Sequence, residues 1–111
     1  MLNQSILVGR IKDNPKMITE DGKDKVSLII GVQRAYKNSE GIYDTDYLKC
    51  ILWNNIATNT ADYCRAGDVV GIKGRLQSKT YEHKNNEVEY VTEIIAEKIT
   101  FLSSKATRNE I

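Results

Sequence analysis

Residues 46–53 read DYLKCILW, and residues 54–64, which follow directly, read NNIATNTADYC. In the first stretch every second residue is leucine or cysteine and alternates with Tyr47, Lys49, Ile51 and Trp53, a period typical of a strand with one buried face. The second stretch has helical spacing over residues 56–64, and Asn54 or Asn55 is suited to cap such a helix. The face expected to pack inward consists of Ile56, Thr60, Tyr63 and Cys64. The sequence therefore predicts a strand that passes directly into a short helix.

Four further segments, residues 6–11, 25–36, 69–81 and 88–102, have the composition of strands and are separated by turn residues. Gly31 is expected to form a β-bulge, and Gly67 to adopt a left-handed conformation after the helix. Three strands, one short helix and two more strands is the order of an OB-fold, a five-stranded Greek-key barrel. Other small β-barrels fit the strand pattern, and the helix between the third and fourth strands is what favours the OB-fold. We therefore predict an all-β OB-fold barrel.

The composition limits the chain to one small domain. It has 111 residues, of which 41% are apolar and 28% charged, and its formal net charge is +1. A basic surface must therefore come from segregation of charge, and residues 69–81 do carry three cations and no acid. Cys50 and Cys64 lack metal-binding spacing and the chain has one histidine, His83, so no metal or other cofactor is expected.

Two alternating runs predict a surface of rings and cations. If Leu48, Cys50 and Leu52 face the core, the opposite face of that strand carries Tyr47, Lys49, Ile51 and Trp53. The fourth strand similarly presents Lys73, Arg75, Gln77, Lys79 and Tyr81. Aromatic rings stack on unpaired bases of any identity, and cations follow the phosphates. A single tryptophan at a strand end often packs into a core, but here the leucines already supply the opposite face.

Five segments, in this order and at matching spacing, resemble the bacterial single-stranded DNA-binding protein (SSB) family. They are LVGRI at 7–11 followed by Pro15, DYLKCILW at 46–53, residues 63–67, GRLQ at 74–77 with Lys79 and Tyr81, and YVTE at 90–93. The resemblance covers residues 1–103, which we expect to form the OB-fold DNA-binding domain. It implies a non-enzymatic protein that assembles, usually as a homotetramer, and binds and wraps single-stranded DNA during replication, recombination and repair.

The resemblance also implies which residues contact DNA. The base-stacking aromatics of the family fall on Tyr36, Tyr47, Trp53 and Tyr81. The alternation independently places three of these four rings on an outward face. The cations expected to contact phosphates are Arg34, Lys49, Lys73, Arg75 and Lys79.

Members of the family usually continue into a Gly-, Pro- and Gln-rich linker that ends in an acidic, apolar tip, whereas this sequence ends at Glu110-Ile111. Residues 104–111 are expected to form a short polar tail, and recruitment of replication or repair proteins through a tip of that kind is not expected. The sequence shows no signal peptide and no stretch of about 18 apolar residues, which predicts a cytoplasmic protein without a membrane partner.

Two alternatives belong to other classes. A primosome-type assembly factor uses the same barrel chiefly for protein contacts and binds DNA weakly, and loss of the stacking rings would distinguish it. An enzyme such as a small nuclease needs a clustered base, nucleophile or metal site, and the sequence offers none. We therefore expect a DNA-binding protein.

Overall fold

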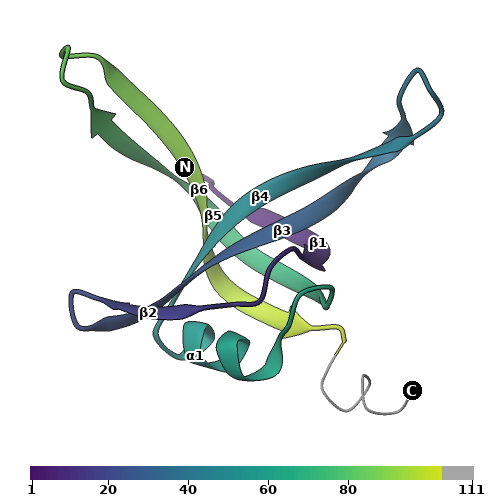
Figure 1. Ribbon diagram of the computed structural model, residues 1–111, viewed down its shortest axis with the longest axis horizontal. Helices are drawn as coiled ribbons and strands as arrows, with labels where there is room; N and C mark the ends of the chain where they lie inside the picture. The colour runs from purple at the N-terminus through teal and green to yellow at the C-terminus, as the bar shows by residue number, and fades with distance from the viewer. Residues whose placement is uncertain (104–111) are drawn as a thin grey trace.

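The computed structural model describes residues 1–103, and Figure 1 shows how their elements are arranged. The elements in chain order are β1 (Ser5–Ile11), β2 (Met17–Glu20), β3 (Lys23–Lys37), β4 (Tyr43–Trp53), α1 (Asn54–Tyr63), β5 (Val69–Glu82) and β6 (Val88–Phe101). The five strands and the helix expected from the sequence are all present. The expected polar tail, residues 104–111, lies outside the described residues.

Five strands close into a barrel. The strand order is β1-β5-β6-β4-β3-β2, and β1 also pairs with β3, which joins the two sides of the sheet. All neighbours are antiparallel except β4 and β6, which pair in parallel at Cys50–Ile94 and Ile51–Ile95. With one helix between β4 and β5, this is the OB-fold predicted from the sequence. The short strand β2, which pairs only with β3, was not predicted.

The core lies inside the barrel and under α1. On β4, Cys50 and Leu52 have no exposed surface, as the alternation predicts. Side chains from β1, β3, β5, β6 and the helix complete the same cluster, with Ile11, Val26, Leu28, Ile30, Ala57, Cys64, Val70, Ile72, Ile94 and Ala96. Burial of this apolar surface is the main source of stability of a domain of this size.

The helix α1 begins one residue earlier than an asparagine cap would allow. Its N-cap is Trp53, which makes no side-chain capping hydrogen bond, so the predicted cap at Asn54 or Asn55 is wrong. Ala57 and Thr60 are its buried residues. Tyr63, predicted to face inward, remains 51% exposed, and its ring lies 6.0 Å from that of Phe101.

Two hairpins extend beyond the barrel as two-stranded arms, one formed by β3 and β4 and the other by β5 and β6 (Figure 1). Gly31, predicted as a bulge, instead lies in regular register opposite Tyr47. The irregularities fall between Gln33 and Lys37 on the first arm and opposite Lys73/Gly74, where Glu97 is the extra residue on β6. Each shift changes which residues of the two strands lie opposite each other, and therefore which side chains are neighbours in the candidate site.

Candidate nucleic-acid interface

The outer face of the sheet carries both alternating runs, with the strand β6 between them. On β4 this face holds Tyr47, Lys49, Ile51 and Trp53, and through the neighbouring strand β6 it continues onto β5. Ile51 is paired with Ile95, and Ile95 with Arg75, so the runs on β4 and β5 are separated by one strand. The two runs therefore lie on one sheet, with Ile51 and Ile95 between them.

Tyr47 lies against a glycine on the neighbouring strand. A methyl group at Gly31 would be 3.3 Å from Tyr47 Cε1 and 3.3 Å from Thr45 Cγ2, so the ring uses the space that the glycine leaves. Tyr47 is 61% exposed, and the ammonium of Lys12 lies over its ring at 5.1 Å from the centroid. Its position suits stacking on an unpaired base, and contact with Lys12 was not predicted.

Trp53 is only partly exposed, and a buried lysine lies over its ring. The Nζ atom of Lys25 is 5.2 Å from the ring centroid and 2.9 Å from Glu20 Oε2 on β2. The hydrogen bond from Lys25 lowers the pKa of Glu20, and the charge of Lys79 on β5 lowers it further. Trp53, Lys25 and Lys79 therefore belong to one region, in which the unpredicted strand β2 supplies the counter-ion.

We expect Lys25→Met to weaken binding to oligo-dT by about twofold to fivefold, because the loss of an exposed or partly desolvated cation–π contact costs about 0.5–1 kcal/mol. Trp53 fluorescence should change in the unbound protein, because Trp53 is the single tryptophan of the chain. The salt dependence of binding should stay the same, since Lys25 holds the ring rather than a phosphate. Lys23→Met, on the same hairpin, is the control that should change neither. A lower salt dependence for Lys25→Met would instead identify Lys25 as a phosphate contact.

The centre of the face contains a buried carboxylate that sequence reasoning missed. Glu93 is 4% exposed, and its Oε2 lies 3.3 Å from the Nζ of Lys49. Ile51 and Ile95 are also buried, although the alternation placed Ile51 among the outward residues. Lys49 is thus on the predicted face, with its charge directed towards an acid. Glu93 belongs to the YVTE segment that carries the family resemblance, but its charge pattern does not distinguish it from the solvated acids around it.

Arg34 is held by two aspartates on the β3–β4 arm. Its Nε lies 3.1 Å from both carboxylate oxygens of Asp46, its Nη2 2.8 Å from Oδ1, and its Nη1 3.7 Å from Asp44 Oδ2. Asp46 pairs with Val32, which packs against the core, so this cluster lies on the opposite face from Tyr47. Tyr36, 66% exposed, falls in the irregular segment after Arg34. The structure therefore separates Arg34 from the outer face.

The hydrogen bonds from Arg34 hold the pKa of Asp46 below its ordinary value. Because the folded-state pKa is depressed, this pair stabilises the fold above the ordinary aspartate value, and the contribution is lost as the pH falls through the folded-state pKa. We expect an NMR titration of the Asp46 carboxyl carbon to give a midpoint below about 3.9, and Arg34→Gln to return it there. Lys37→Gln, which removes a cation from the same arm, should leave the midpoint low. An unshifted midpoint in the unmodified protein would contradict the pairing.

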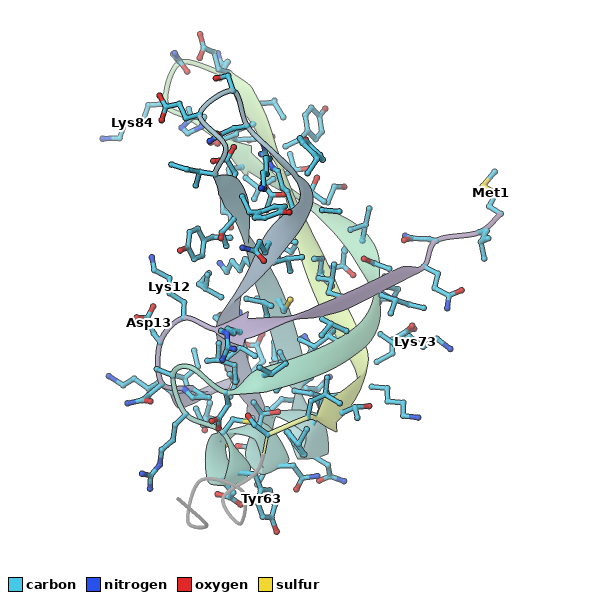
Figure 2. The ribbon with its side chains drawn as sticks, turned by 90° about the vertical axis from the view of Figure 1, so that its right-hand side faces the viewer. Met1, Lys12, Asp13, Tyr63, Lys73 and Lys84 are labelled. Atoms are coloured by element: carbon cyan, nitrogen blue, oxygen red, sulfur yellow. The ribbon has the colours of Figure 1, made fainter. Side chains whose placement is uncertain are left out.

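On β5, the predicted cations divide between two regions. Arg75, Lys79 and Tyr81 lie on the side of the arm paired with Ile95, Val91 and Glu89 of β6. Lys73 lies in the part of β5 that pairs with β1, opposite Ile6 and Lys98, on the side of the molecule away from Lys12 (Figure 2). Arg75 Nη1 donates a hydrogen bond to Gln77 Oε1 at 3.0 Å. The structure therefore brings Arg75, Lys79 and Tyr81 together and leaves Lys73 apart.

The barrel and its outer face define a small OB-fold protein with rings and cations on one surface. Across residues 1–103, no cluster of histidine, cysteine or acidic side chains is arranged to hold a metal ion. The same part of the chain has no helix long and apolar enough to cross a membrane.

Comparison with known proteins identifies the family. Residues 2–102 match the model of the single-strand binding protein family, and the chain belongs to this family, which is not a family of enzymes. Single-stranded DNA-binding protein B of Bacillus subtilis is 39% identical over 106 residues, which are 95% of this chain and 94% of that protein. Single-stranded DNA-binding protein 3 of Listeria innocua is 36% identical over 95% of this chain and 66% of its own length. The Oceanobacillus iheyensis protein is 34% identical over 97% of this chain and 68% of its own length.

Proposed function

We propose that this chain binds single-stranded DNA without sequence preference and protects it during replication, recombination and repair. The observation that carries the proposal is the outer face of β4, β6 and β5, where exposed rings and cations share one surface. Single-stranded DNA is held by stacking of its bases on aromatic rings and by pairing of its phosphates with cations. The family and the names of the relatives support the same ligand.

The base-stacking residues in this proposal are Tyr36, Tyr47, Trp53 and Tyr81. Tyr36, Tyr47 and Tyr81 are 66%, 61% and 43% exposed, so these three rings have surface available for a base. Trp53 presents the larger ring but less of its surface. Loss of the stacking rings would distinguish the assembly factor, and this chain has all four, which favours DNA binding.

The phosphate-binding residues in the proposal are Arg34, Lys49, Lys73, Arg75 and Lys79, and we expect them to contribute unequally. Arg34 and Lys49 already pair with carboxylates, which reduces the charge available to a phosphate. Lys79 and Arg75 share a face with the rings and should contribute most. Lys73 contributes only if the DNA strand continues towards β1, where Lys73 is opposite Ile6.

Self-association, as a homotetramer, is part of the same proposal. Ile6 and Val8 of β1 are 69% and 56% exposed and lie on one face of the strand, which is the surface most in need of cover. Several barrels in one particle would raise the effective concentration of each next site and allow a long strand to wrap. We also propose a cytoplasmic location, where such DNA is exposed in bacteria.

Titration of Trp53 fluorescence with oligo-dT, at low and high salt and against a duplex of equal phosphate content, tests the proposal. Strong quenching by the single strand that persists at high salt, with little response to duplex, is the expected result. Stacking resists salt, whereas phosphate contacts weaken with a slope of about −0.7 each. No binding by any probe, or equal response to duplex, would favour the assembly factor.

A further inference from the structure

A hollow of about 640 Å³ lies where β1 meets β3 beside Tyr47. The strand register explains it, because Tyr47, Gly31 and Arg10 form one row across β4, β3 and β1. Gly31 has no side chain, so the Tyr47 ring lies against its backbone, and both residues line the hollow together with Arg10. The volume falls within the range of roughly 300–1,000 Å³ that is common for small-ligand sites.

The groups around this hollow match the parts of a nucleotide. Tyr47 supplies a ring, and Gln33 and Thr45, paired with each other on the same face, supply uncharged hydrogen-bonding groups. Arg10 and Lys12 supply two positive charges. Among the described residues, none that lines the hollow is acidic. A ring beside cations without a competing carboxylate suits a base with its attached phosphate.

We propose that this hollow is a nucleotide subsite, in which a base stacks on Tyr47 and its phosphate pairs with Lys12, supported by Arg10. The inference rests on the proposed function and extends the path of the strand from β4 across β3 to β1. Lys12 and Arg10 were not among the cations predicted to contact DNA.

Lys12 acts as a reversible cover of the ring. Without DNA its ammonium lies over Tyr47, at 5.1 Å from the centroid. An incoming base takes that place, and the ammonium moves to the phosphate, so one lysine serves both states. Lys12 is exposed and projects outward at the end of β1 (Figure 2), whereas its backbone is fixed by a 2.9 Å hydrogen bond from its N–H to the Ile29 carbonyl.

Arg10 is oriented without losing its charge. Its Nη1 donates a hydrogen bond to the carbonyl of Gly67 at 3.0 Å, and a carbonyl carries no formal charge to neutralise it. Asp13, close to Lys12 in the sequence, does not line the hollow. The subsite therefore retains both charges for a phosphate, in contrast to the ion-paired Arg34.

The test is Lys12→Gln in the full chain, with binding followed by the anisotropy of a labelled oligo-dT of about 12 nucleotides, within the range that one OB barrel covers. Loss of one phosphate contact should lower the salt slope by about 0.7, which corresponds to about eightfold weaker binding at ~50 mM salt and less than about twofold near ~0.5 M. Lys16→Gln is the matched control, since it removes the same charge from a residue that does not line the hollow.

Gly31→Ala supplies an independent measurement. The added methyl group would crowd Tyr47 and Thr45 at 3.3 Å, and should weaken binding without changing the salt slope. If wild-type protein binds oligo-dT but Lys12→Gln behaves like Lys16→Gln, the subsite is wrong and the proposed function stands. If wild-type protein does not bind oligo-dT, both are wrong. A slope lowered by Lys12→Gln alone supports the subsite.

Discussion

Trp53→Ala is expected to weaken binding of oligo-dT by about fivefold to 150-fold, because a base stacked on an aromatic ring contributes about 1–3 kcal/mol. The slope of affinity against salt should not change, since no phosphate contact is removed. Binding has to be followed by the anisotropy of a labelled oligonucleotide, because the substitution removes the only tryptophan of the chain. Trp53→Phe, which keeps a ring, should retain most of the affinity.

Tyr90→Ala is the control for this experiment. Tyr90 is 74% exposed but pairs with Thr80, on the face of the β5–β6 arm opposite to Tyr81. Removing a ring from that face should leave the affinity unchanged. Equal loss with Trp53→Ala and Tyr90→Ala would mean that exposed rings contribute nonspecifically and that the outer face is not the binding surface. Circular dichroism would show that each variant keeps the fold.

Gly74→Ala should lower the free energy of unfolding by about 3 kcal/mol or more. A methyl group there would overlap the carbonyl oxygen of Ile95 and lie 3.0 Å from its carbonyl carbon. These are backbone atoms of the neighbouring strand β6, so the clash cannot be relieved by turning a side chain. The expected result in thermal unfolding is a midpoint lower by more than about 10 °C, measured at fixed protein concentration.

Gly71→Ala, on the same strand, provides the comparison. Its methyl group would meet its nearest neighbours, Leu7 and Thr100 among them, at 3.9 Å, an ordinary contact distance. We expect a change within about 0.5 kcal/mol. Similar destabilisation by both substitutions would show that any side chain on β5 disturbs the barrel, and that the close approach at Gly74 has no special role.

The fold was predictable because its strands have one buried face. On β4, successive side chains point to opposite faces, so the alternation that buries Cys50 and Leu52 also orients Tyr47 and Trp53 on the other face. β2 gave no such signal, since all four of its residues are exposed. Trp53 was not predictable as the N-cap of α1, because its side chain makes no capping hydrogen bond.

The site was predictable in outline but not in its charges. The alternation of side chains along β5 assigns Arg75 and Lys79 to one face. Which carboxylate pairs with a lysine, however, depends on how the strands are registered. The sequence does not reveal that Lys49 meets a buried Glu93, or that Arg34 is held by Asp46. Lys73 shares parity with Arg75, but it is opposite Ile6 of β1, at the end of the run away from Tyr81. The direct contacts of each cation thus come from the fold alone.

The buried thiol of Cys50 reports how often the barrel opens. Its side chain has no exposed surface, and burial raises the pKa of its thiol to about 11, so neither access nor a thiolate is available in the closed state. A soluble thiol reagent can modify it only when β4 separates from its neighbours. Because Tyr47 and Trp53 are on the other face of the same strand, a ligand bound there would slow that opening. The rate at which a thiol reagent modifies Cys50 therefore measures how strongly a ligand bound on the outer face protects the barrel from opening.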